Sequence, residues 1–65
     1  MQVSRASDIN VGDEFTYDNG SSWWCASRVE PRPEAQVWVE AQGVGRLHGA
    51  VMSQSFMLTH AILRR

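Results

Sequence analysis

Few side chains of this 65-residue chain could do chemistry, and the first candidates are Cys25, His48 and His60. A thiol beside an imidazole can form a nucleophile–base pair, because the imidazole removes the thiol proton and leaves the reactive thiolate. The alternation of neighbouring residues predicts Cys25 on the inward side of a strand, between aromatic residues. A thiol in that position behaves as a small hydrophobic group. We therefore interpret Cys25 as structural and expect no enzyme.

Other catalytic and ligand-binding patterns are weak. Asp13, Glu14 and Asp18 form a short acidic cluster, which is more typical of a solvated hairpin rim than of paired catalytic carboxylates. The segment Gly43-Val44-Gly45 lacks the third glycine and the following helix of a phosphate-binding loop, so it predicts a turn. One cysteine and two histidines without C-x-x-C or H-x3-H spacing do not match a structural zinc site. The sequence predicts no cofactor and no metal.

The residues best suited to binding are Trp24, Arg28 and Trp38. Tryptophan and arginine are enriched at binding hot spots, since they bury a large area and carry a polar group. We expect all three on one outward face, with Arg28 opposite Trp38, where an exposed cation–π contact contributes about 0.5–1 kcal/mol. Arg46 and His48, alternating on a later strand, could join Arg28 in a modest positive patch. The alternative is that one or both indoles pack under the C-terminal residues as core.

Short strands must position these residues. The pattern of apolar residues predicts strands over Asp13–Tyr17, Trp23–Glu30, Gln36–Gln42 and Arg46–Met52. Pro31-Arg32-Pro33 is expected to stop the second strand, because proline lacks the backbone N–H and has a fixed φ. Ser53-Gln54-Ser55 is expected to break the fourth. The last ten residues, Phe56–Arg65, fit either a short helix or a fifth strand after a single 3-10 turn.

The loop after the first strand decides which tryptophan is buried. A two-residue turn places Phe15 opposite Trp24, whereas a three-residue loop at Asp18–Gly20 places Phe15 opposite Trp23. A slip of one residue exchanges the two faces of the whole second strand. We prefer the three-residue loop, because the other register turns two charged residues of that strand into the core, where their burial is costly.

The segments that carry the strongest pattern are Val11-Gly12-Asp13-Glu14-Phe15, a turn with Gly20, an aromatic second strand, Val37–Val39 and Ala61-Ile62-Leu63. Together they resemble the SH3-like small β-barrels, which include KOW-type, Tudor-type and plasmid dihydrofolate-reductase-type barrels. The resemblance implies an all-β fold, a small barrel of about five short antiparallel strands over residues 1–65. The loop with Asp18 and Asn19 differs from the basic loops of nucleic-acid-binding members. The acidic loop and paired tyrosines of signalling SH3 domains are also lacking. Because one superfold hosts many functions, the resemblance implies no activity.

Charge and size limit the choice of partner. The net charge is −1, and all six cations are arginines. A nonspecific nucleic-acid binder usually carries a positive excess, so we disfavour nucleic acid, although Trp24, Arg28 and Trp38 could form a stacking platform. A chain of this size barely supports a core, and its single cysteine cannot form an internal disulfide. We therefore predict a homodimer, in which a small-ligand site between copies is another possible function.

The remaining features concern compartment and role. No stretch approaches the roughly 18 apolar residues of a membrane span, and the first nine residues lack the apolar core of a signal peptide. A single thiol is typical of the reducing cytoplasm. The small size, the arginine bias and the lack of a catalytic set predict a protein-binding accessory protein. Phage-encoded proteins that bind and modulate a host protein are of this kind.

Overall fold

The computed structural model describes residues 2–65 as six antiparallel strands in one sheet, so the all-β prediction is confirmed. The strands are β1 (Gln2–Arg5), β2 (Glu14–Thr16), β3 (Trp24–Arg32), β4 (Gln36–Gly43), β5 (Val51–Met57) and β6 (Ala61–Arg64). Two short 3-10 turns, η1 (Ala6–Asp8) and η2 (Gly45–Leu47), lie between strands. The order in the sheet is β1-β6-β2-β3-β4-β5.

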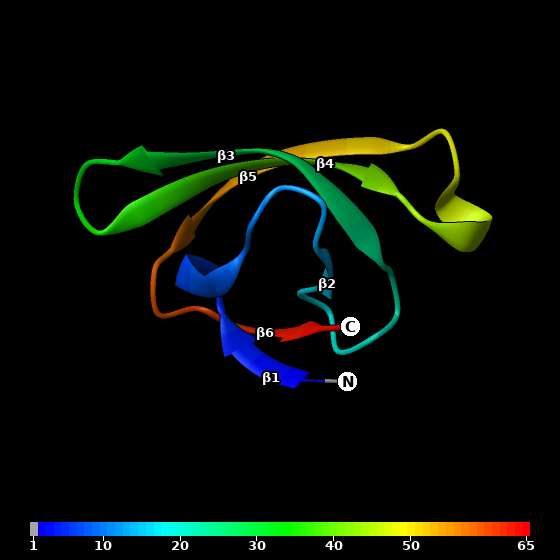
Figure 1. Cartoon of the computed structure of the whole chain (residues 1–65), viewed down its shortest axis with the longest axis horizontal. Coiled ribbons are helices and arrows are strands. Elements are labelled where there is room, and N and C mark those ends of the chain that lie inside the picture. The colour runs from blue at the N-terminus through cyan, green and yellow to red at the C-terminus, as the bar shows by residue number, and fades with distance from the viewer. Residues whose placement is uncertain (1) are drawn as a thin grey trace.

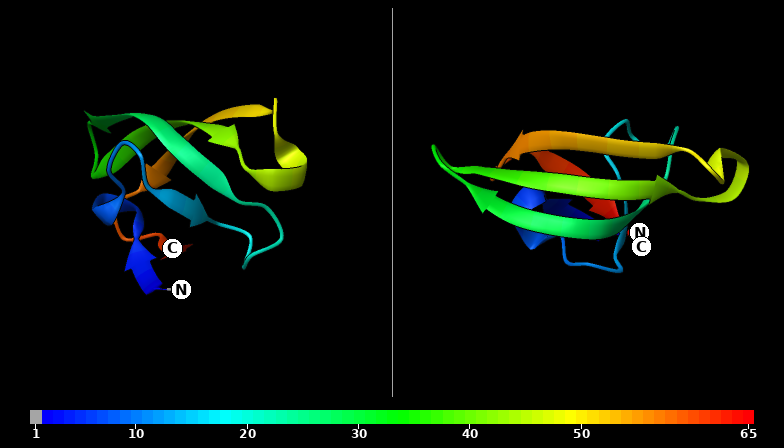
Figure 2. Two further views of the ribbon diagram at one scale, coloured as in Figure 1. Left: turned by 45° about the vertical axis from the view of Figure 1, so that its right-hand side comes forward. Right: turned by 90° about the horizontal axis from the view of Figure 1, so that it is seen from above.

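The sheet bends into two layers that enclose the core. Strands β3, β4 and β5 lie side by side above β1 and β6, and both chain ends lie near each other (Figures 1 and 2). Apolar side chains from both layers are buried between them: Ile9, Phe15, Ala26, Val37, Val39, Ala41, Phe56 and Ile62. The edge strands β1 and β5 form no ladder with each other in the described chain, so the sheet is open. The SH3-like barrel is therefore not confirmed.

The second predicted strand ends later than expected. β3 continues through Pro31, which pairs with Val37, so the prediction that the prolines stop this strand at Glu30 is wrong. The neighbouring strand β2 pairs only with Trp24 and Cys25. Beyond those residues β3 has a neighbour on one side only, and a strand with a free side tolerates the missing N–H of proline.

The predicted fourth strand is also displaced. Instead of a strand over Arg46–Met52, the chain forms η2 and a turn, and β5 begins only at Val51. Gly45 and Gly49 take positive φ values of 66° and 93°, which allow this compact connection. The three residues expected to break the strand, Ser53-Gln54-Ser55, lie inside β5, where the side chains are exposed and need no apolar character. Of the last ten residues, Phe56 and Met57 end β5 and Ala61–Arg64 form β6, so the strand alternative is confirmed, but an ordinary turn and not a 3-10 turn precedes the strand.

The preferred hairpin register is wrong. Phe15 lies opposite Trp24, not Trp23. The connection is neither a two-residue nor a three-residue turn, because β2 ends at Thr16 and β3 begins at Trp24. Trp24 therefore shares the core side of the sheet with Phe15 and packs against the buried cluster.

A bulge in β3 explains why this register does not bury charge. The pairing with β4 shifts between Ala26 and Arg28, which leaves Ser27 as an extra residue. An extra residue reverses the alternation of side chains along the strand. Ala26 is buried before the bulge, and Val29, opposite the buried Val39, packs against the core after it. Strict alternation without a bulge therefore predicts the wrong face for Trp24 and Cys25.

The loop of residues 17–23 is organised by Thr16, which is fully buried. The Thr16 hydroxyl donates to Asp18 Oδ1 at 2.6 Å and accepts the Gly20 amide at 3.1 Å. Asp18 Oδ1 also accepts the Ser22 amide at 2.9 Å. The hydrogen bond from Thr16, followed by the bonds from Ser22, outweighs desolvation and lowers the pKa of the Asp18 carboxyl.

We expect Thr16→Val to lower the free energy of unfolding by about 1–3 kcal/mol, since it removes a buried hydroxyl and leaves its partners unsatisfied. Urea denaturation measures the loss, and Thr59→Val, at an exposed turn, is the control with a change below about 0.5 kcal/mol. The lowered pKa of Asp18 contributes stability above the ordinary carboxyl pKa, and that stability disappears as the pH falls through the folded-state pKa. The difference between wild type and Thr16→Val should therefore narrow in acid. A constant difference would contradict the role of the Asp18 carboxylate.

Candidate functional site

The outward side of β3, β4 and β5 carries two of the residues predicted to bind, Arg28 and Trp38, among further charged and polar side chains. We call this surface the Trp38 face; it consists of Arg28, Glu30, Arg32, Trp38, Glu40, Ser53 and Ser55. Trp38 lies opposite Glu30 of β3 and Ser55 of β5, so it occupies the middle strand of the three. Its neighbours in β4, Val37 and Val39, are buried on the other side, which leaves the half-buried indole on the outside.

Two charged side chains orient the indole of Trp38. Its Nε1 donates to Glu40 Oε2 at 2.9 Å, and the guanidinium carbon of Arg32 lies 5.4 Å from the ring centroid. The predicted opposition of Arg28 to Trp38 is wrong, because Arg28 lies opposite Glu40. Since β3 extends to Arg32, the hairpin turns around residue 34, later than expected, and Arg32 takes the place over the ring.

Ion pairs between arginine and glutamate side chains surround the indole, so the charges near it balance one another. Arg28 Nε donates to Glu30 Oε1 at 2.9 Å, and Arg28 Nη1 lies 3.6 Å from Glu40 Oε2. Arg32 Nη2 lies 3.1 Å from the other oxygen of Glu30. The hydrogen bond that Arg28 donates to Glu30, then the negative charges of Glu30 and Glu40, raise the pKa of Arg28. Exposed ion pairs contribute little stability, so their main effect here is to hold side chains in place.

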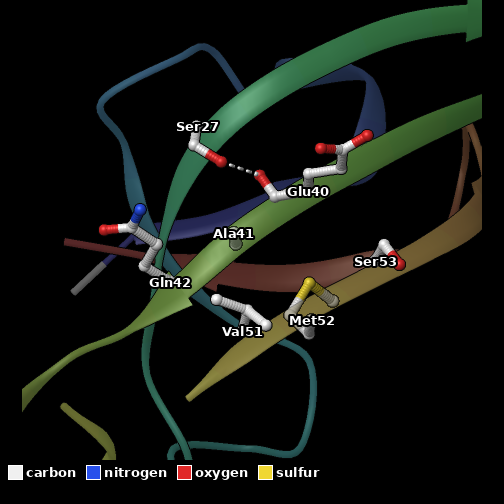
Figure 3. Close-up of a pocket in the computed structure, with 7 residues that line it drawn as sticks. All are labelled: Ser27, Glu40, Ala41, Gln42, Val51, Met52 and Ser53. Carbon is white, nitrogen blue, oxygen red and sulfur yellow. Dashed lines mark hydrogen bonds between the residues drawn. The ribbon is translucent and has the colours of Figure 1, made fainter. Parts of the chain in front are cut away.

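A hollow adjoins the Trp38 face where β4 ends and β5 begins. It has a volume of about 490 Å³ and is lined by Ser27, Glu40, Ala41, Gln42, Val51, Met52 and Ser53 (Figure 3). The bulge residue Ser27 donates to the Glu40 carbonyl at 3.1 Å, which fixes one wall. Within residues 2–65, no three His, Cys, Asp or Glu side chains come together as a metal site. The hollow offers the hydroxyls of Ser27 and Ser53, the amide of Gln42, the carboxylate of Glu40 and apolar groups.

Three of the predicted binding residues lie elsewhere. Trp24 faces the core side of the sheet and is half-buried, with Phe15 and Gly43 as its strand partners. Arg46 and His48 do not alternate on a strand, because Arg46 lies in η2 and His48 in the turn after it. Arg46 Nη2 donates to the Ser21 carbonyl at 2.7 Å and so ties η2 to the loop before β3. Of the predicted group, the structure brings together only Arg28 and Trp38.

The predicted inward position of Cys25 is also wrong. Cys25 lies opposite Glu14 and Gln42 on the outer side of the sheet and is half-buried. Its Sγ lies 3.7 Å from the Gly12 carbonyl oxygen. The reversal has the same cause as that of Trp24, because one register positions both residues.

Sequence reasoning assigned no role to the last two arginines, Arg64 and Arg65. The guanidinium carbon of Arg65 lies 4.0 Å from the ring centroid of Trp23, and its Nε lies 3.0 Å from Glu14 Oε1. Arg64 donates to the Ser4 hydroxyl at 2.9 Å and to Asp13 Oδ2 at 3.2 Å. These partners are 42 to 60 residues away in the chain, so no local pattern indicates them.

The Trp24 indole has an unusual environment. Its Nε1 is buried and has no hydrogen-bond partner among the described residues. Leaving a buried donor unsatisfied costs about 1–3 kcal/mol. The apolar contacts of the Trp24 ring with the core therefore stabilise the fold, while its unpaired N–H destabilises it.

We expect Trp24→Phe to change the free energy of unfolding by less than about 1 kcal/mol, because removal of the unpaired N–H offsets the smaller ring. Trp38→Phe is the matched control. It removes an N–H that is paired with Glu40, so it should lower stability by about 0.5–1.5 kcal/mol. Denaturant titration of both variants measures the contrast. A larger loss for Trp24→Phe than for Trp38→Phe would contradict the unpaired state of the Trp24 indole.

Comparisons of the chain with protein-family models, with characterised proteins and with solved structures gave no match. Among residues 2–65, no helix has the length and apolar character needed to cross a bilayer. The function must therefore be argued from the Trp38 face and its surroundings.

Proposed function

We propose that this chain is a non-enzymatic protein-binding module and that the Trp38 face is its binding surface. The observation that carries the proposal is an outward, half-buried indole held between Arg32 and Glu40 at the middle of a three-stranded surface. A side chain that is already ordered loses little conformational entropy on binding. Tryptophan and arginine are also the residues most enriched where binding energy concentrates.

The charges of the Trp38 face favour a protein over a nucleic acid. Arg28 and Arg32 each pair with one oxygen of the Glu30 carboxylate, and Arg28 also approaches Glu40. Two cations and two anions leave the face without net charge, whereas phosphate recognition needs unpaired positive charge. A protein partner can offer both carboxylates and guanidinium groups to such a surface, and apolar side chains to the indole.

The proposed role is that of a small accessory protein that binds and modulates a larger one, as phage-encoded proteins that bind a host protein do. Its small size and lone cysteine suit the cytoplasm, where thiols stay reduced. The ordered indole supplies the anchor that such a protein needs, because few residues usually dominate an interface.

Affinity capture from a lysate of the source organism tests this proposal. The wild type and Trp23→Ala should retain the same partner, while Trp38→Ala should lose it. Trp23 is the matched control because it is also a half-buried indole with an arginine over its ring, but it stacks with the C-terminal Arg65. Circular dichroism should first show that both variants are folded.

Equal capture by Trp38→Ala and wild type would contradict the proposal. Retention on heparin at about 50 mM salt that vanishes by about 200 mM would instead support a nucleic-acid partner. The arginine pairing predicts no such retention.

A further inference from the structure

The strand β5 has one unpaired edge. It pairs only with β4, and the hydrogen bonds beyond its two ends show which of its residues face that neighbour. The Ala50 carbonyl accepts the Gly43 amide at 2.8 Å, and the Leu58 amide donates to the Ala35 carbonyl at 2.9 Å. Hydrogen-bonded positions alternate along an antiparallel ladder, so the even-numbered residues between them also face β4. The backbone groups that point away from the sheet belong to Val51, Ser53, Ser55 and Met57.

Nearly all of these outward groups are free within the described chain. One is used, since the Met57 carbonyl accepts the His60 amide at 3.0 Å. Natural edge strands are usually protected by short length, charge, proline or a bulge. β5 is seven residues long, contains no charged residue or proline, and its ladder with β4 has no bulge. It therefore lacks the usual protection.

The opposite edge of the sheet shows the contrast. β1 has only four residues and includes Arg5. The Arg5 amide, which points outward, is taken by Asp8 Oδ2 at 2.9 Å. A short, charged and partly capped edge offers little to another strand, so the two edges are not equivalent.

We propose that β5 pairs with β5 of a second copy, antiparallel and around a two-fold axis at Gln54, so that two sheets become one. Outward backbone groups occur only on odd-numbered residues, so hydrogen-bonded pairs must join odd positions to odd positions. An axis at Gln54 satisfies this rule and overlaps the full strand. It places Val51 opposite Met57 of the second copy and Ser53 opposite Ser55 of the second copy.

The side chains of β5 fit this arrangement and identify the occupant as a second copy. Val51 and Met57 are 76% and 51% exposed, and across the axis they would cover each other. On the core side, Met52 would face Phe56 of the second copy, which continues the apolar layer. A two-fold axis brings each charged side chain near it close to the same side chain of the second copy, and the two like charges repel. Residues 51–59 contain no charged side chain, so this repulsion is absent.

The dimer would join the two Trp38 faces into one surface. Trp38 lies in β4, opposite Ser55 of β5. In the dimer, only the two paired β5 strands would therefore lie between the Trp38 face of one copy and that of the other. The pairing does not depend on what the Trp38 face binds. Loss of capture by Trp38→Ala and loss of the dimer are separate results.

Sedimentation equilibrium on a pair of variants tests the backbone pairing. The wild type should reach twice the 7.3 kDa mass of one chain at micromolar concentration. Ser53→Pro should raise the dimer dissociation constant by about 100-fold or more, because it removes an outward N–H and crowds the edge while no bond to β4 is lost. Ser53→Ala keeps the N–H and should remain dimeric. A monomeric wild type, or equal dimerisation of both variants, would overturn the proposal.

Charge pairs test the register without relying on proline. Val51→Lys combined with Met57→Lys places like charges together across the axis and should give a monomer. Val51→Lys combined with Met57→Glu places opposite charges together and should restore the dimer. The two substituted residues are about 20 Å apart within one extended strand, so they do not pair within a chain. Identical behaviour of the two double variants would overturn the axis at Gln54.

Hydrogen exchange locates the interface. The amides of Val51, Ser53 and Ser55 should be protected in the dimer and exchange faster on dilution, while Met52, Gln54 and Phe56 stay protected throughout. A dimer in which the odd-numbered amides still exchange quickly would contradict the proposal. A monomer whose odd-numbered amides become protected only when a foreign protein is added would assign the edge to that protein's strand instead.

Discussion

Phe15→Ala is expected to lower the free energy of unfolding by about 3–5 kcal/mol, which is comparable to the whole stability of so short a chain. Phe15 is completely buried. It lies in β2 between Trp24 of β3 and Arg64 of β6, at the place where the two layers are connected. Removing the ring leaves a cavity, and β3 and β6 cannot easily move in to close it because both are held by their pairing with β2.

Urea denaturation followed by circular dichroism measures this effect. Val3→Ala is the control, because Val3 is 78% exposed and its truncation should change stability by less than about 0.5 kcal/mol. A loss below about 1 kcal/mol for Phe15→Ala would show that the two layers do not close over this ring.

Gly43→Ala is expected to lower the free energy of unfolding by about 1–3 kcal/mol. Gly43 ends β4, where η2 folds back on it, and an added Cβ would lie 2.6 Å from Leu47 Cβ and collide with the Leu47 carbonyl. Unlike Gly45 and Gly49, Gly43 does not have a positive φ. The effect is therefore steric, and it acts mainly on the position of η2.

Denaturant titration gives the size of this loss, and amide chemical shifts should change mainly over residues 43–50. Gln42→Ala, an exposed neighbour in the same strand, is the control and should stay within about 0.5 kcal/mol of wild type. Unchanged stability in Gly43→Ala would contradict the close packing of η2 on the end of β4.

Part of the Trp38 face could be predicted from local alternation. The predicted outward position of Trp38 is confirmed, because its strand neighbours Val37 and Val39 are buried on the other side. Alternation is local, because successive side chains of a strand point to opposite sides whatever its neighbours are. The outward position of Trp38 follows from this rule alone.

The neighbours of Trp38 could not be predicted in the same way. Whether Arg28 or Arg32 lies over the indole depends on where the hairpin turns, and Pro31 misled the prediction. A proline ends a strand that is paired on both sides, but β3 is paired on one side only at that residue. The short length of β2, which leaves β3 unpaired on that side at Pro31, decided where β3 ends and which arginine lies over the indole. No local pattern contains this information.

The sequence by itself determined an all-β chain, the strands around Phe15, Trp24 and Trp38, and the side of β4 that carries Trp38. Only the tertiary structure decided the register of β3, and with it the burial of Trp24 and the outward position of Cys25. The physical reason lies in two features that local alternation does not contain. The loop bound by Thr16 sets the pairing of Trp24 and Cys25 with β2, and the bulge at Ser27 reverses the side chains after it and so keeps Val29 on the core side. Side-chain direction within a strand is a local property, whereas pairing between strands depends on residues far apart in the chain.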